Sequence, residues 1–375
     1  MSLGIYVHLP FCPYICPYCD FAKWPMRRTA ATRYLQALYA ELDREQSAPA
    51  ETIFLGGGTP NAYDAQEVVD LVQRLRARFC AQEMREISIE VNPELVRDGD
   101  FERYRSAGVN RVSIGVQSFD AAEIATLGRK HTRSDIARAV SAARRSSIPS
   151  ISIDLMFAVP GQTAASWRRS LETAISLDVD HVSTYGLTIE EGTPYAAWAA
   201  RQPRAFMDDG GEAELYEIVI AMLGAAGYEH YEISNFARPG HESVHNANYW
   251  ANGEYIGLGV GAASYRNGTR SVHTRDLGQY VAAATSGSEI PGESEHLKGL
   301  QKVGEAIMLA LRTSRGVELA SFAKRYGVDV PLRYAPVVRE FHEAGLLEVD
   351  ERSIRLTQRG RFLANDVCGA FVTFE

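Results

Sequence analysis

The sequence predicts an α/β protein in which helices pack against a parallel β-sheet. Two observations lead to this fold class: short apolar, β-branched runs recur through the first 235 residues, and amphipathic helical segments separate them. Six β-then-α units in succession are typical of a parallel sheet with helices outside it. The six strand-like runs are Gly4–His8, Thr52–Leu55, Ile87–Val91, Arg111–Val116, Ser150–Phe157 and His181–Leu187.

A third observation concerns the polar motifs, which follow the ends of these runs. In an open sheet and in a barrel alike, reactive groups gather at the carboxyl ends of parallel strands. The alternation alone does not separate these two architectures. It does predict that the cysteine loop after the first run and the glycine loop after the second belong to one site.

The texture of the chain changes after about residue 235. Residues 236–299 are rich in Gly, Asn, His and aromatic side chains, so we expect a loop-rich extension there. From residue 300 onwards, three helical patterns, a short hairpin and a last helix resemble a winged helix. The expected units are therefore residues 1–235, 236–299 and 300–375.

Composition and charge exclude several classes of function. The chain has 46% hydrophobic residues and a net charge of −8, from 39 basic and 47 acidic side chains, which argues against a nucleic-acid partner. Between residues 318 and 361, eight Lys or Arg face seven Asp or Glu, so the winged-helix-like unit lacks the basic surplus of a phosphate reader. No run approaches the roughly 20 apolar residues of a membrane span, and no signal peptide opens the sequence. We expect a cytoplasmic protein.

Three of the five cysteines lie on one short loop after the first run, as Cys12-x3-Cys16-x2-Cys19. Three thiolates on one loop can reach three corners of an iron–sulfur cubane and leave one iron open. Zinc is the alternative, but a structural zinc site is normally closed by a fourth protein ligand, for which only His8 is at hand. The spacing therefore favours an iron–sulfur cluster. The remaining thiols, at positions 80 and 368, are expected in the core.

Several polar residues at strand ends are candidates for binding a small ligand. The three glycines in the run from Phe54 to Pro60 would let a ligand approach the backbone closely. Glu90 and Asp154 lie within apolar strands, where a carboxylate is costly without a partner, although a structural salt bridge explains Glu90 equally well. Arg129 could clamp a carboxylate, or could be a solvated arginine.

The cysteine spacing, with the aromatic Tyr18 before the third cysteine, resembles that of the radical S-adenosylmethionine (SAM) enzymes. In that family the cluster is [4Fe–4S], its open iron binds SAM, and one electron cleaves SAM to a 5′-deoxyadenosyl radical. The glycine run looks like the family's motif for the methionyl amine of SAM. The resemblance therefore implies SAM as a cofactor beside the cluster.

Further segments resemble the branch that contains oxygen-independent coproporphyrinogen III oxidase and related haem chaperones. These segments are Asp154–Thr163, Tyr185–Pro194 and Tyr231–Pro239. The resemblance implies a partial six-stranded β/α barrel with a small C-terminal domain. It also implies that the following residues contact SAM: Tyr6, Gly57, Gly58, Thr59, Glu90, Gln117, Arg129 and Asp154.

Two features separate the oxidases from the chaperones within this branch. The oxidase pattern has a fourth cysteine two residues after the third, where this chain has Phe21. The oxidases also carry a long segment before the cysteine motif, whereas the motif of this chain already begins at Cys12. The run His245-Asn-Ala-Asn-Tyr-Trp250 matches an HNxxYW signature of the chaperones, which implies His245 as a haem ligand. A hydrogen-bonded loop histidine is the alternative. Many relatives have a histidine where this chain has Ala263.

The expected function is that of a haem chaperone that binds a [4Fe–4S] cluster, SAM and haem, and delivers haem to acceptor proteins. A protein with a reducible cluster also needs an electron donor, so this expected function implies an electron-donor protein as a further partner. The alternative is a coproporphyrinogen III oxidase that converts two propionates of a porphyrinogen to vinyl groups. A radical enzyme acting on another substrate is a third reading. No catalytic residue can be named, and enzyme activity stays open.

Overall fold

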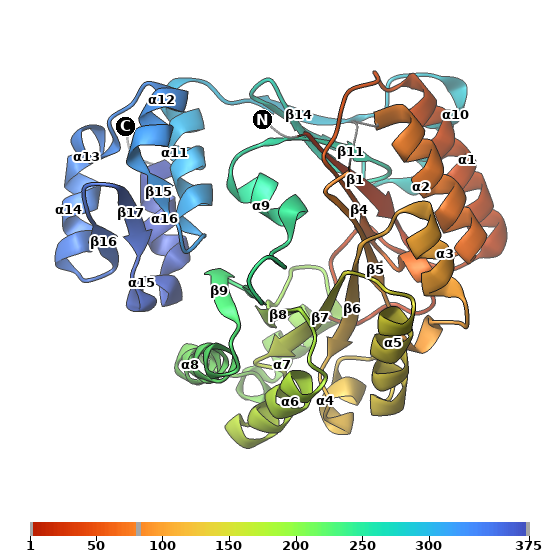
Figure 1. The fold of residues 1–375 in the computed structure, drawn as a ribbon, viewed down its shortest axis with the longest axis horizontal. Helices are drawn as coiled ribbons and strands as arrows, with labels where there is room; N and C mark the ends of the chain where they lie inside the picture. The colour runs from red at the N-terminus through yellow and green to blue at the C-terminus, as the bar shows by residue number, and fades with distance from the viewer. Residues whose placement is uncertain (1–2, 80–83, 373–375) are drawn as a thin grey trace.

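A computed structural model describes residues 3–79 and 84–372 of the chain (Figure 1). Its centre is formed by six parallel strands, and each lies where the sequence predicted a strand. In order across the sheet they are β1 (Leu3–Leu9), β4 (Thr52–Gly57), β5 (Glu86–Val91), β6 (Arg111–Gln117), β7 (Ser150–Phe157) and β8 (His181–Gly186). The predicted α/β class and partial barrel are confirmed, because the strand order is linear and its two ends do not pair.

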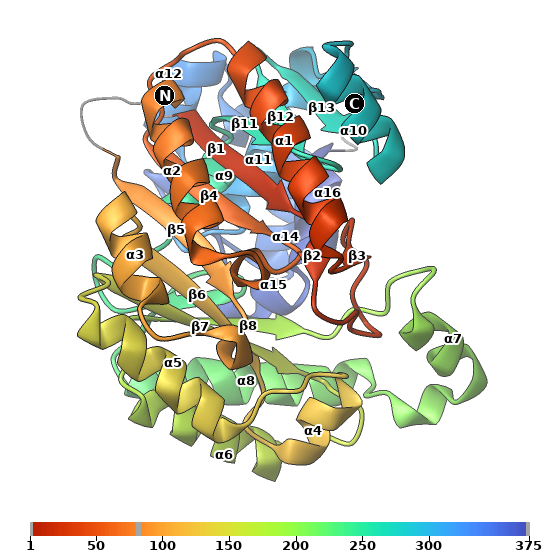
Figure 2. The same cartoon turned by 90° about the vertical axis from the view of Figure 1, so that its right-hand side faces the viewer.

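Helices cover the outer face of these strands, as Figure 2 shows for the first half of the chain. Each helix turns an apolar stripe to the sheet; in the first one, Tyr34, Leu38 and Leu42 recur at four-residue spacing and are buried. The covering helices are α1 (Arg28–Arg44), α2 (Ala65–Phe79), α3 (Asp100–Ala107), α4 (Ala121–Thr126), α5 (Arg133–Arg145), α6 (Ala164–Ser176) and α8 (Asp209–Ala225). The inner face is thereby left for other segments.

The expectation of a loop-rich extension over residues 236–299 is wrong, because regular elements occupy most of it. They are α9 (Val244–Trp250), β11 (Glu254–Leu258), β12 (Ala263–Arg266), β13 (Thr269–His273), α10 (Leu277–Ser286) and β14 (Gly292–His296). β11 pairs in parallel with β1, and the next three strands continue the sheet antiparallel. Every residue of β13 is half-buried and every residue of β14 is exposed, so neither shows the alternation that reveals a strand.

At the opposite edge, the sheet ends in two short antiparallel strands, and two minor elements stand apart. The edge strands are β10 (Asn235–Ala237) and β9 (Glu229–Glu232). A two-stranded ribbon of β2 (Phe11–Cys12) and β3 (Trp24–Pro25) follows β1, and α7 (Pro194–Arg201) follows β8. The sheet therefore extends to twelve strands in all within the described residues.

The C-terminal domain has a hydrophobic core of its own and matches the predicted winged-helix-like order. Its elements are α11 (Gly299–Leu311), β15 (Val317–Glu318), α12 (Leu319–Tyr326), α13 (Val330–Arg333), α14 (Ala335–Glu343), β16 (Leu347–Val349), β17 (Ser353–Leu356), α15 (Gln358–Phe362) and α16 (Ala364–Val372). Cys368 is buried in this core, as expected, whereas Cys80 lies outside the described residues. The exact domain boundaries stay predictions.

The inner face of the barrel is covered by α9, which lies between the sheet and the C-terminal domain (Figure 1). It contacts β1, β4 and β11 on one side and α11 on the other. The HNxxYW segment is therefore an internal helix of the fold.

Among the described helices, none combines the length and the apolar character that a bilayer crossing requires.

Candidate cofactor and ligand sites

The three clustered cysteines lie on a loop of residues 12–22, here called the cluster loop. Its base is closed by the β2–β3 ribbon and by the Met26 amide, which donates to the Cys12 carbonyl at 2.7 Å. All three thiols are free and partly exposed. Burial raises the pKa of Cys12 to about 11, and repulsion from Cys19 and Cys16 adds to it, while a hydrogen bond with Thr59 opposes it. Together the thiolates would need a bound cation to balance them.

The geometry of His8 argues against zinc. Its Nε2–H donates to the Ala22 carbonyl at 2.7 Å, so its Nδ1 is an acceptor, and the Tyr6 hydroxyl donates to it at 2.9 Å. Neither imidazole nitrogen is left to close a tetrahedral site. Across the described residues, no three His, Cys, Asp or Glu side chains are grouped as ligands of one metal ion. Three thiols without a fourth protein ligand fit a cubane with one open iron.

The glycine loop is held against the end of β1 and the start of β2, directly before the cluster loop. The amides of Gly58 and Thr59 donate to the carbonyls of Leu9 and Phe11 at 2.9 and 3.1 Å. Gly57 has φ +106°, and a Cβ on Gly58 would lie 2.6 Å from the backbone of Pro10, so glycine is required at both positions. With these amides engaged, the loop offers its carbonyl oxygens, which suit an amine.

Two carboxyl groups lie inside the barrel on β5 and β7, the two strands that flank β6. The Glu90 carboxylate accepts the Gly57 amide at 3.2 Å, and Ser113, opposite Glu90 in the next strand, donates to Asp154 at 2.9 Å. Burial, followed by repulsion from Asp154, raises the pKa of Glu90 to about 7, and burial also raises the pKa of Asp154. Both groups are therefore placed to accept hydrogen bonds from a ligand rich in hydroxyl or amine groups.

Arg129 and Gln117 complete what we call the barrel site. The Arg129 guanidinium donates to Asn92 Oδ1 and to the Gly115 carbonyl, both at 2.8 Å, and lies 3.9 Å from Cys16 Sγ. Its Nε is buried without a partner, which an anionic ligand would supply. Gln117 has φ +63° at a β-bulge, an uncommon conformation that turns its side chain out of the strand register.

Tyr18 also lies next to the cluster loop cysteines, as the resemblance implied. Its ring packs edge-on against Tyr195 with centroids 6.2 Å apart. Burial, followed by the charge of Cys16, raises its pKa, so the phenol stays neutral. Of the predicted SAM residues, Thr59 and Arg129 contact Cys12 and Cys16, whereas Tyr6 lies in the middle of β1. The role of each in binding SAM stays a prediction.

His245 is placed differently from these residues. It is 1% exposed, its Nδ1 hydrogen-bonds Thr52 Oγ1 at 2.8 Å, and its Nε2 hydrogen-bonds the Tyr249 hydroxyl at 2.7 Å. Burial lowers its pKa to about 3, so the imidazole is neutral. Both ring nitrogens are therefore occupied, and direct iron coordination by His245 remains a prediction that would require one of these bonds to break.

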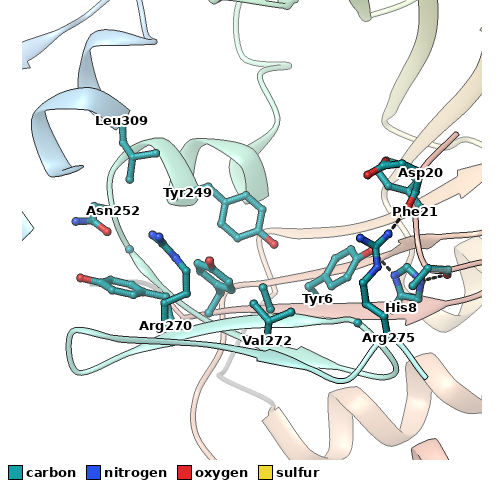
Figure 3. A pocket seen from close by; sticks show the side chains of 16 residues that line it. Tyr6, His8, Asp20, Phe21, Tyr249, Asn252, Arg270, Val272, Arg275 and Leu309 are labelled. Carbon is teal, nitrogen blue, oxygen red and sulfur yellow. Dashed lines mark hydrogen bonds between the residues drawn. The ribbon is translucent and has the colours of Figure 1, made fainter. Parts of the chain in front are cut away.

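A cavity of about 470 Å³ lies beside the cluster loop; we call it the aromatic pocket (Figure 3). Asp20, Phe21 and Ala22 form the wall that it shares with the cluster loop, and Leu309 reaches it from the C-terminal domain. The remaining wall includes four tyrosines and two arginines, Tyr6, Tyr249, Tyr255, Tyr265, Arg270 and Arg275. The tyrosine rings offer flat aromatic surface, and Arg270 in β13 and Arg275 just after β13 supply positive charge. This combination suits a planar ligand that carries carboxylates.

A continuous series of ring contacts, two face-to-face and two edge-on, runs behind this pocket. Neighbouring ring centroids are 6.2, 5.2, 4.8 and 4.6 Å apart. In order, the rings are Tyr6, Phe54, His245, Tyr249 and Tyr255. His245 is thus the central, buried ring of a series whose two ends, Tyr6 and Tyr255, both line the pocket.

Sequence reasoning missed the residues that hold α9 and the pocket in place. Glu86 is 4% exposed, and its carboxylate accepts the amides of Val244 and His245 at 2.7 and 3.2 Å, which fixes the start of α9. Arg270 forms a salt bridge with Glu305 of α11. An acidic residue at the start of an apolar strand was the available signal for Glu86, whereas nothing near Arg270 in the sequence indicates its partner.

Comparison with known proteins agrees with this geometry. The model of the radical SAM superfamily matches residues 6–174, and that of the HemN C-terminal domain matches residues 298–363. The chain is 34% identical to "Heme chaperone HemW" of Bacillus subtilis, over 98% of each chain. It is 38% identical to "Heme chaperone HemW" of Escherichia coli over 69% of each, and 35% identical to that of Mycobacterium tuberculosis over 97% of this chain and 93% of the relative.

Among solved structures, the coproporphyrinogen III oxidase HemN from Escherichia coli is similar in fold. Its TM-score is 0.87 at 24% sequence identity, and the match covers 100% of this chain and 91% of that one. At this identity the similarity establishes the architecture and leaves the reaction open. The curated relatives are matched over nearly their whole length in the first cases, so both domains are shared with them.

Proposed function

Because the chain belongs to the HemW family of the radical SAM superfamily, we propose that it is a haem chaperone, which binds haem as cargo and passes it to acceptor proteins. The observation that carries this proposal is the position of the aromatic pocket. It borders the cluster loop through Asp20–Ala22 and combines tyrosine rings with Arg270 and Arg275. A tetrapyrrole needs such a flat apolar surface with cations for its propionates.

The barrel site would hold the resident cofactors. Cys12, Cys16 and Cys19 would bind a [4Fe–4S] cluster. When reduced, this cluster would supply one electron to SAM. The glycine-loop carbonyls would accept the SAM amine, and Arg129, with its unpartnered Nε, would pair with the SAM carboxylate. Glu90 and Asp154 would accept hydrogen bonds from ribose hydroxyls.

The alternative, oxidation of coproporphyrinogen III, is the other outcome of the same experiment. Phe21 occupies the position of the fourth oxidase cysteine and is 59% exposed at the rim of the pocket. The apolar ring there offers surface for a porphyrin face and no thiol for chemistry. This substitution favours binding of cargo over turnover.

The test is an anaerobic incubation of the reconstituted protein with reductant, SAM and coproporphyrinogen III, followed by a haem titration. We expect no protoporphyrinogen over several turnovers, stoichiometric haem binding, and transfer of haem to an apo-acceptor protein in a difference spectrum. Protoporphyrinogen in excess over protein would establish the oxidase instead. We further propose that the cluster takes its electron from a separate donor protein and that the chain works in the cytoplasm.

A further inference from the structure

We propose that Tyr249, not His245, is the axial ligand of ferric haem in the aromatic pocket, and that His245 is the positioning residue for its hydroxyl. This inference rests on the proposed haem-chaperone function. It starts from accessibility: His245 is 1% exposed and both its nitrogens are hydrogen-bonded, whereas the partly exposed Tyr249 lines the pocket. Phenolate is an established axial ligand of ferric haem.

The HNxxYW spacing explains why the two residues occur together. Four residues apart on α9, His245 and Tyr249 lie on one helix face, and the side-chain contact of 2.7 Å between Nε2 and the hydroxyl follows from that spacing. Glu86 and Thr52 hold the helix start and the Nδ1 side of the imidazole. The histidine thus fixes the direction of the Tyr249 hydroxyl through their hydrogen bond, and Figure 3 shows Tyr249 among the side chains that line the pocket.

A second tyrosine–histidine pair lines the same pocket, and its hydrogen bonds rule it out as the ligand. His8 Nε2–H must donate to the Ala22 carbonyl, so its Nδ1 presents a lone pair to the Tyr6 hydroxyl. A phenolate at Tyr6 would face that lone pair and be repelled. His245 has the hydroxyl of Thr52 as its other partner, and a hydroxyl can donate to Nδ1. His245 Nε2–H can then donate to a phenolate at Tyr249.

The coordination step balances without a further reactant. The Tyr249 O–H bond breaks, an iron–oxygen bond forms to the ferric ion, and the proton leaves to solvent at the partly exposed side of the ring. The iron keeps its oxidation state.

The experiment titrates ferric haem into wild type, Tyr249→Phe, Tyr6→Phe and Tyr255→Phe, each with reconstituted cluster, and records absorption and resonance Raman spectra. Tyr255→Phe is the matched control, because it removes one hydroxyl from the same wall. We expect an iron–phenolate signature in wild type, Tyr6→Phe and Tyr255→Phe, and its loss in Tyr249→Phe with affinity lowered about 10- to 100-fold. Equal cluster iron in all four proteins shows that each has folded.

A fifth protein, His245→Leu, tests the positioning role. We expect it to keep the phenolate signature at a shifted energy and to release haem faster. Retention of the signature in Tyr249→Phe, its loss in Tyr6→Phe, or an imidazole signature in wild type that His245→Leu abolishes would overturn the inference and leave the chaperone function standing. Wild type that binds no haem would overturn both.

Discussion

The barrel site draws its side chains from the ends of consecutive strands, whereas the aromatic pocket draws them from segments far apart in the chain. Glu90, Gln117 and Asp154 come from β5, β6 and β7, which are neighbours in the sheet and in the sequence. The pocket combines the cluster loop with α9, β13 and α11. A site of the first kind follows from the fold class, and a site of the second kind depends on how distant segments pack.

The two regions also differ in what holds them together. Backbone hydrogen bonds join the glycine loop to Leu9 and Phe11, directly before the cluster loop, so this part of the barrel site is fixed by main-chain geometry. The pocket depends on side chains that bridge elements, such as Glu86 at the start of α9 and the Arg270–Glu305 salt bridge. Side-chain substitutions should therefore disturb the pocket more than the barrel, except at the cysteines themselves.

The largest expected effect is on the cluster. Cys16→Ala removes one of the three thiols, so we expect loss of the cluster and of its visible absorption, measured together with iron content after anaerobic reconstitution. Cys368→Ala, which removes a buried thiol from the C-terminal core, is the control and should keep full iron content. A Cys16→Ala protein with unchanged iron and absorption would show that the cluster loop is not the cluster site.

Glu86→Ala should destabilise the pocket side of the molecule. It leaves the amides of Val244 and His245 without their charged acceptor, so we expect a loss of about 3 kcal/mol in the free energy of urea unfolding. Glu51→Ala removes an exposed carboxylate that pairs with Arg85 and should cost less than about 1 kcal/mol. Equal losses in the two variants would contradict the role assigned to Glu86.

Glu41 gives the region behind β11 a pH dependence. It is 3% exposed, accepts the Gly259 amide at 2.9 Å, and burial raises its pKa from 4.5 to about 7. Between these two pH values the folded protein holds a proton that the unfolded chain has released. The contribution of Glu41 to stability is therefore greatest below pH 4.5 and is lost as the pH rises through 7. We expect this group to account for a fall of about 3 kcal/mol in the free energy of unfolding.

Glu41→Gln should make this fall smaller by the share of Glu41, because the amide does not titrate, while Glu90 and Glu232, whose pKa values burial also raises to about 7, keep theirs. The free energy of unfolding is measured in urea from pH 4.5 to pH 8, with Asp43→Asn, an exposed carboxylate of the same helix, as the control. Asp43→Asn should follow the wild-type curve. A Glu41→Gln curve that falls as steeply as wild type would assign the proton to another group.

The smallest effect on stability is expected at the wall shared by the two regions. Phe21 is 59% exposed, so Phe21→Ala should change the free energy of unfolding by less than about 0.5 kcal/mol. It should nevertheless weaken haem binding by about fivefold, since the ring forms part of the pocket rim, and this is measured by titration. Ile15→Ala, at an exposed apolar residue of the same loop, is the control.

The sequence was sufficient for the six parallel strands of the barrel, while the members of the barrel site stay predictions. Short apolar runs separated by helical patterns located the strands, and parallel pairing brings their carboxyl ends to one edge of the sheet. It was insufficient for β13 and β14, whose residues show no inside–outside alternation. It also could not reveal that His245 is enclosed by Thr52, because that contact joins residues 193 positions apart.

The parallel pairing of β1 with β11 has a consequence for how the protein is made. Leu3 is paired with Glu254, so one neighbour of the first strand is synthesised about 250 residues after it. At ribosomal rates this delay is roughly 10–50 s, and such non-local pairing also slows folding. The three cysteines, which follow β1 closely, are therefore synthesised well before the part of the pocket wall that α9, β12 and β13 form. The order of synthesis thus allows metallation before the cargo site is complete.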